Sequence, residues 1–152
     1  PGFAYAAPQA AGNTWYPERF IAPLEHNEPW LSSALDLVAE TLARLAAAGI
    51  PAEKTVLLGF SQGACLALEY AARNAQRYGG VAALTGGLIG PDDTPRNYPG
   101  SLARVNHSTE VMRQLGGTVT ERIYPRMGHT INDDELREVR LMLAALTREE
   151  TA

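Results

Sequence analysis

Apolar residues recur at helical spacing in the segment before residue 50. From Leu31 to Leu45 they follow one another at intervals of four, three, four and three residues, which predicts a helix with one apolar stripe. We expect Asn27 to cap this helix, with Pro29 in its first turn. The stripe consists of Leu31, Leu35, Val38, Leu42 and Leu45, and Gly49 and Pro51 should end the helix.

Short apolar runs predict strands between the helices. The run 55–60, TVLLGF, is typical of a strand that is buried on both faces. The runs 3–7 and 81–87 are interpreted as two shorter buried strands, and 119–124 as a strand of alternating character. Residues 8–29 carry several prolines and a glycine, so they are expected to form a long irregular loop.

Further helices are expected after each of the later strands. Residues 62–75 have a helical pattern rich in Ala and Leu. Residues 104–115 fit a helix with Val111, Met112 and Leu115 facing inward, after a loop that runs to about residue 100. Asn132 and Glu135 form a capping-box-like pair before the last helix. Its apolar stripe consists of Leu136, Val139, Leu143 and Leu146.

The alternation of strands and helices predicts the fold class. It is typical of an α/β domain with a mostly parallel sheet that is covered by helices on both faces. We expect residues 1–152 to form one such domain. In these sheets functional groups collect at the carboxyl ends of the strands.

Composition narrows the classes of partner. The net charge is −4, which argues against nucleic acid or an anionic membrane as a partner, because both attract basic surfaces. No run approaches ~18 apolar residues, so no transmembrane segment is expected, and no signal sequence is visible. Cys65 is the only cysteine, which excludes an internal disulfide and makes the cytoplasm the default location. No set of residues is spaced to bind a metal.

Candidate chemistry begins at Ser61, which lies in the motif Gly59-Phe60-Ser61-Gln62-Gly63 where a predicted strand meets a predicted helix. A nucleophile on such a sharp turn has strained backbone angles, and glycines two positions either side remove side chains that would clash. The backbone N–H of Gln62 can then bind an oxyanion near the positive end of the helix. The alternative is an ordinary glycine-flanked turn with a capping serine.

A serine needs a base to take its proton. Among the three histidines, only His129 follows the last predicted strand and has a flexible glycine neighbour, so we assign it as general base and then acid. The alternative is a solvated loop histidine. His26 and His107 are interpreted as surface residues.

The segments GFSQGA, TWYPERF, LIGP and YPRMGHTI resemble the phospholipase/carboxylesterase family of α/β-hydrolases, which is related to acyl-protein thioesterases. The resemblance covers nearly the whole chain. It implies a serine hydrolase that acts on carboxylic esters or thioesters of small or lipid-like substrates without a cofactor. By matching position it implies Ser61 as nucleophile, His129 as base and Gln62 as an oxyanion donor. Members of this family often form homodimers.

Two parts of the family pattern are missing from this sequence. The opening strands, whose loop supplies a second oxyanion N–H, should precede residues 3–7. A strand and the loop with the triad aspartate should lie between Ala103 and Arg104. Three hypotheses explain the gaps: the sequence comprises the ordered parts of a longer chain, it is a true deletion fragment, or Asp92 or Asp93 replaces the acid. Solvated turn residues are the alternative for these two aspartates.

Other residues support weaker hypotheses. Trp15 in the irregular loop and Leu88 after a strand are candidates for a substrate pocket, with loop anchoring and core packing as the respective alternatives. Cys65 is interpreted as a small buried core residue. Two other functions stay open: a hydrolase-like binding domain without turnover, and an enzyme like the dienelactone hydrolases, which usually carry cysteine at the position of Ser61.

Overall fold

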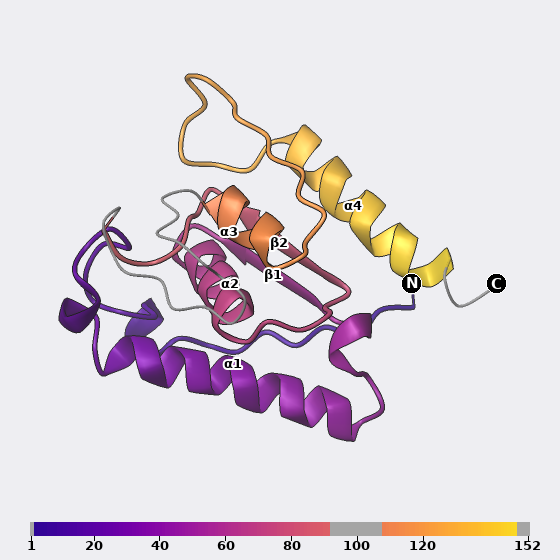
Figure 1. The fold of residues 1–152 in the computed structure, drawn as a ribbon, viewed down its shortest axis with the longest axis horizontal. Coiled ribbons are helices and arrows are strands. Elements are labelled where there is room, and N and C mark those ends of the chain that lie inside the picture. The colour runs from indigo at the N-terminus through magenta and orange to yellow at the C-terminus, as the bar shows by residue number, and fades with distance from the viewer. Residues whose placement is uncertain (1, 92–107, 149–152) are drawn as a thin grey trace.

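The computed structural model describes residues 2–91 and 108–148. Two strands and four α-helices follow one another along these segments (Figure 1). They are α1 Trp30–Ala47, β1 Val56–Phe60, α2 Gln62–Arg73, β2 Gly80–Leu84, α3 Ser108–Gln114 and α4 Asp133–Arg148. Short 3₁₀ turns lie at Ala11–Asn13, Leu24–His26 and Ala52–Lys54. None of the helices in these segments is both long and apolar enough to cross a membrane.

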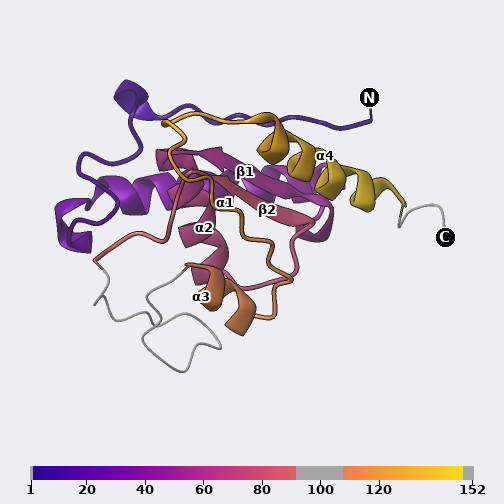
Figure 2. The same cartoon turned by 90° about the horizontal axis from the view of Figure 1, so that it is seen from above.

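β1 and β2 pair in parallel, with Val56 opposite Gly80 and Phe60 opposite Leu84. Parallel neighbours need a crossover connection, which α2 provides. Figure 2 shows α2 and α4 on opposite sides of the two strands. A Cβ on Gly80 would lie 2.3 Å from the sulfur of Met142, so α4 reaches the start of β2 closely. The prediction of a parallel sheet with helices on both faces is therefore confirmed.

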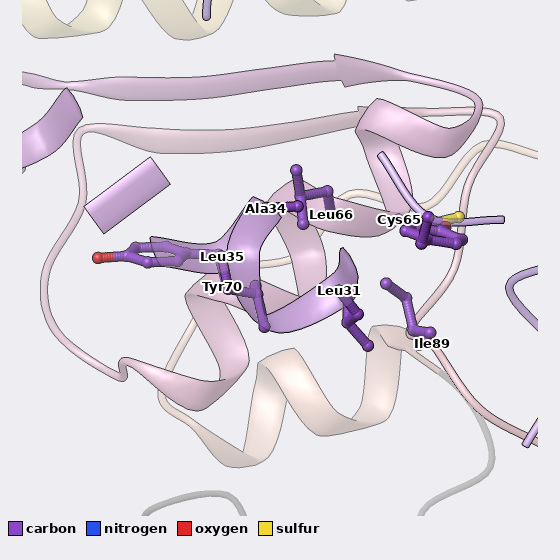
Figure 3. Packing of buried hydrophobic residues seen from close by; sticks show 8 residues of the cluster. Leu31, Ala34, Leu35, Cys65, Leu66, Tyr70 and Ile89 are labelled. Carbon is purple, nitrogen blue, oxygen red and sulfur yellow. The ribbon is translucent and has the colours of Figure 1, made fainter. Parts of the chain in front are cut away.

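The main core lies between α1, α2 and the irregular loop. Leu31 and Leu35 of α1 pack against Leu66 and Tyr70 of α2 (Figure 3). Tyr16 of the loop is buried in the same cluster. A second cluster joins Leu68 and Ala72 of α2 to Leu88 and Val111. Helix α2 contributes to both clusters, and nearly all of its length is buried. This burial explains why residues 62–75 carry apolar residues around most of the helix.

The start of α1 differs from the prediction. Asn27 is fully buried and does not cap the helix with its side chain. Its Oδ1 accepts a hydrogen bond from the backbone N–H of Glu18, and its Nδ2 donates to the carbonyl of Arg19. The carboxylate of Glu28 accepts from the N–H of Ser32 in the first turn instead. Asn27 satisfies backbone groups of the loop, which is the requirement for a buried amide.

The predicted strands at 3–7 and 119–124 are wrong, because neither segment pairs with another strand in the described structure. Tyr5 is 87% exposed and Ile123 is 79% exposed. Burial of 55–60 on both faces is also wrong, since Leu58 is 57% exposed. Extended, apolar sequence favours a strand, but the strand forms only where a neighbour offers hydrogen bonds.

The remaining helices follow the prediction closely. Helix α2 ends two residues before the expected limit. Val111 of α3 is buried, and Met112 and Leu115 pack against the same cluster. Residues 92–107, which hold part of the predicted loop and the start of the predicted helix, lie outside the described residues. On α4 the stripe is only partly covered, because Val139 is buried whereas Leu136 is 39% exposed.

The capping box at α4 is confirmed. The backbone N–H of Glu135 donates to Oδ1 of Asn132 at 2.9 Å, and the N–H of Asn132 donates to the Glu135 carboxylate at 2.9 Å. Two N–H groups that the helix itself cannot bond are thereby satisfied.

Replacing this cap should destabilise the protein measurably. We expect Asn132→Ala to lower the free energy of unfolding by about 1 kcal/mol, because it removes the side chain that accepts from Glu135. Asn132→Asp keeps an acceptor oxygen and serves as the matched control. Urea unfolding followed by circular dichroism gives both values, and equal losses in the two variants would contradict the role of the cap.

Candidate active site

Ser61 lies on a sharp turn between β1 and α2. Its backbone has φ 54° and ψ −120°, a strained conformation for a residue with a side chain. The turn is held on both sides. The N–H of Ser61 donates to the carbonyl of Leu84 at the end of β2, and the carbonyl of Ser61 accepts from Ala64 and Cys65. These hydrogen bonds hold the backbone of Ser61 in its strained conformation.

Of the two motif glycines, only Gly59 occupies a position where a side chain would clash with its neighbours. A Cβ on Gly59 would lie 2.2 Å from the carbonyl oxygen of Gly63, so β1 and the first turn of α2 are too close for any side chain there. A Cβ on Gly63 would meet nothing nearer than Nε1 of Trp15, at 3.9 Å. The expected clash therefore holds for Gly59 and is wrong for Gly63. Sequence reasoning missed Gly86, where a Cβ would lie 2.5 Å from Cβ of Ala64.

His129 meets Ser61 from the other end of the described structure. Its Nε2 lies 2.8 Å from Oγ of Ser61, a hydrogen-bond distance. The imidazole ring also lies against the ring of Phe60, with the centroids 5.0 Å apart. The geometry brings together the two residues that the sequence singled out, and it allows a proton to pass from the hydroxyl to the imidazole.

Contacts to α4 hold the segment that leads to His129. The hydroxyl of Tyr124 donates to the carboxylate of Asp134 at 2.6 Å, and the guanidinium of Arg122 lies 2.8 Å from the carboxylate of Glu138. The hydrogen bond from the Tyr124 hydroxyl is the main cause that lowers the pKa of Asp134, and the hydrogen bond from the Arg137 guanidinium is the second. The bond between Tyr124 and Asp134 also raises the pKa of Tyr124. Side-chain contacts rather than strand pairing therefore tie residues 119–124 to the fold.

Gln62 is the first residue of α2, where the helix leaves its N–H groups without internal partners. The Gln62 N–H thus lies beside Ser61 at the positive end of the helix, which suits an oxyanion. Its side chain has a role that sequence reasoning missed. Oε1 accepts from the N–H of Trp15 at 2.7 Å, and Nε2 donates to the carbonyl of Tyr16 at 2.8 Å.

No carboxylate of the described residues hydrogen-bonds to His129. Asp92 and Asp93, the substitutes considered for a triad acid, lie outside the described residues, as do the Ala103–Arg104 junction and His107. His26 is exposed in the turn Leu24–His26. Within residues 2–91 and 108–148, no three His, Cys, Asp or Glu side chains are grouped to hold a metal ion.

The two pocket candidates have different surroundings. Trp15 is half-buried and packs against the main core cluster, close to Gly63. Leu88 is 5% exposed and belongs to the second cluster, which favours the core-packing alternative for this residue. Cys65 is buried, as expected, and accepts from the N–H of Gly87. Burial raises the pKa of its thiol, which disfavours the reactive thiolate form.

The close approach at Gly59 makes a sharp prediction. Gly59→Ala should cost about 3 kcal/mol or more in the free energy of unfolding, because β1 and α2 must separate to admit the methyl group. Gly63→Ala is the matched control and should change stability by less than about 1 kcal/mol, since its methyl group has room. Chemical denaturation measures both. Similar stabilities for the two variants would contradict the packing described here.

Comparison with known proteins places the chain in a family. The profile of the family described as Phospholipase/Carboxylesterase matches residues 5–105. Acyl-protein thioesterase 1 of Gibberella zeae is 30% identical over 115 residues, which cover 62% of this chain and 49% of that protein. The chain thus spans about half of the length of this curated relative.

A solved structure extends the likeness beyond the family match. The crystal structure of a phospholipase/carboxylesterase from Dyadobacter fermentans superposes with a TM-score of 0.82 at 42% identity, and covers 90% of this chain and 74% of that chain. The family match contains Ser61 and Gln62, whereas His129 lies beyond it. The chain therefore belongs to the phospholipase/carboxylesterase family and has the α/β-hydrolase fold.

Proposed function

We propose that this protein is a serine hydrolase that cleaves carboxylic esters or thioesters through an acyl-serine intermediate. The observation that carries the proposal is the 2.8 Å distance between Nε2 of His129 and Oγ of Ser61 on a strained turn. Family membership supports it, and so does the similarity to a protein named as an acyl-protein thioesterase.

The geometry supports the following acylation step. Oγ of Ser61 attacks the carbonyl carbon of the substrate while its proton passes to Nε2 of His129. Negative charge develops on the carbonyl oxygen, and the N–H of Gln62 binds it at the start of α2. The bond to the leaving oxygen or sulfur then breaks, and His129 gives its proton to the departing alcohol or thiol.

Deacylation repeats these steps with water. His129 takes a proton from the water as the water oxygen attacks the acyl-serine. The carboxylic acid leaves and Ser61 regains its proton from His129. Phe60 supports this role, because its ring packs against the imidazole and limits the positions that His129 can take. The half-buried Trp15, which lies near Gly63, is proposed as one wall of the substrate pocket.

Replacing either member of the pair should remove the activity. Ser61→Ala and His129→Ala are each expected to lower kcat for p-nitrophenyl esters by roughly 10⁴-fold or more, and the double variant should be no worse than either, because the two act as a unit. His26→Ala changes an exposed histidine that is not part of the Ser61–His129 pair, so this variant is the control and should keep full activity.

Labelling separates an enzyme from a binding domain without turnover. A fluorophosphonate should modify the protein at Ser61, as located by mass spectrometry of the digested product, and His129→Ala should slow the labelling greatly. A folded protein that resists the reagent, or Ser61→Ala with unchanged turnover, would contradict the proposed function.

A further inference from the structure

The side-chain amide of Gln62 forms hydrogen bonds through both its oxygen and its nitrogen, and all its partners in the described structure lie in residues 14–16. Oε1 accepts hydrogen bonds from the N–H of Trp15 at 2.7 Å and from the hydroxyl of Thr14 at 3.2 Å. Nε2 donates to the carbonyl of Tyr16 at 2.8 Å. Three successive residues of the loop are therefore fastened to the residue that directly follows Ser61. We call residues 14–16 the Trp15 segment.

The Trp15 segment has a second attachment that fixes its direction. The ring of Tyr16 is buried at 1% exposure among Leu31, Leu66 and other residues of the main core cluster. The single proton of the Thr14 hydroxyl is shared between the carbonyl of Tyr16, at 2.9 Å, and Oε1 of Gln62, at 3.2 Å, which closes the segment on itself. With Tyr16 held in the core and the backbone held by Gln62, little freedom remains for the side chain between them.

That side chain is the indole of Trp15, which lies over the first turn of α2. Its Nε1 would be 3.9 Å from a Cβ on Gly63, which is two residues after Ser61. The indole is only half-buried, so part of it stays accessible next to the turn. An aromatic side chain held beside the turn would contact a substrate group that extends from Ser61 over the first turn of α2.

We propose that Gln62 is a positioning residue whose side chain holds the Trp15 segment against the Ser61 turn and thereby sets selectivity for the apolar part of the substrate. The proposal rests on the proposed function and deepens it. One residue then serves two purposes, because its backbone N–H faces the reacting carbonyl while its amide places the wall. A shift of the wall affects binding of apolar groups and leaves the N–H in place.

The first test reports the position of Trp15 without any need for activity. The chain has two tryptophans, and Trp30 is 55% exposed at the start of α1, so Trp30→Phe leaves Trp15 as the only indole. In that background, Gln62→Met keeps the volume of the side chain and removes its hydrogen bonds. We expect a red-shifted emission and stronger quenching by acrylamide. Gln76→Met, which changes an exposed glutamine bonded to Tyr78, is the control and should change neither.

The second test separates positioning from a general loss of structure. Any change in kcat caused by Gln62→Met should be equal for p-nitrophenyl acetate, butyrate and octanoate, because the three esters use the same oxyanion donor. KM for octanoate should rise about tenfold, because the released Trp15 no longer contacts the apolar chain. The rise should shrink toward acetate. Trp15→Ala should show the same profile, and the double variant should add nothing to it, as expected for two residues that act through one contact.

Several outcomes would overturn the proposal. They are unchanged Trp15 fluorescence in Gln62→Met, an equal rise in KM for all three esters, or additive effects of Gln62→Met and Trp15→Ala on KM for octanoate. If Gln62→Met fails to fold, Thr14→Val removes one of the same hydrogen bonds and should give a smaller shift of the same kind. If Gln62→Met releases Trp15 but the wild type has no esterase activity, the proposed function is wrong. The hold of Gln62 on the Trp15 segment, which we call the clamp, is then still supported.

Discussion

The contact between Gly59 and the carbonyl of Gly63 is the constraint on which the candidate site depends. The last residues of β1 lie directly against the first turn of α2, so close that no side chain fits at Gly59. The chain must reverse within the three residues between, and Ser61 takes the strained conformation that this requires. The bond from its N–H to Leu84 of β2 ties the turn to the sheet. The hydroxyl is then left free to meet His129.

The two halves of the site are held by different physical means. Ser61 and Gln62 are positioned by backbone hydrogen bonds and by the burial of α2, which stabilise them strongly. His129 depends on a segment without strand pairing in the described structure. Its attachments are the exposed ion pair between Arg122 and Glu138, the half-buried hydrogen bond between Tyr124 and Asp134, and the capping box at Asn132. Exposed ion pairs contribute little individually. The histidine side of the site therefore rests on side-chain contacts, whereas the serine side rests on backbone hydrogen bonds.

Local patterns in the sequence predicted most of the helical structure. The stripes of α1 and the capping box of α4 depend on neighbours within one or two turns, so sequence spacing suffices to find them. The failed strands at 3–7 and 119–124 depend on a partner strand, which a local pattern does not report. Asn27 was misassigned for a similar reason, because its partners Glu18 and Arg19 lie in a loop whose course depends on tertiary packing.

The site shows the same division. Ser61 was predictable from its motif, and His129 from its place after the last apolar run, and the structure brings the two side chains within 2.8 Å. The clamp between Gln62 and residues 14–16 joins positions more than forty residues apart and leaves no periodic signal. The close approach of Gly86 to α2 could not be predicted from the sequence either, because no motif surrounds this glycine.

A crystal structure of the intact protein after reaction with a fluorophosphonate would test the roles of Ser61, Gln62 and His129 together. We expect a phosphorus–oxygen bond to Oγ of Ser61 and a phosphoryl oxygen within about 3 Å of the N–H of Gln62. Nε2 of His129 should stay within hydrogen-bond reach of the Ser61 oxygen. A phosphoryl oxygen turned away from Gln62, with His129 displaced into solvent, would show that these three residues do not form the catalytic site.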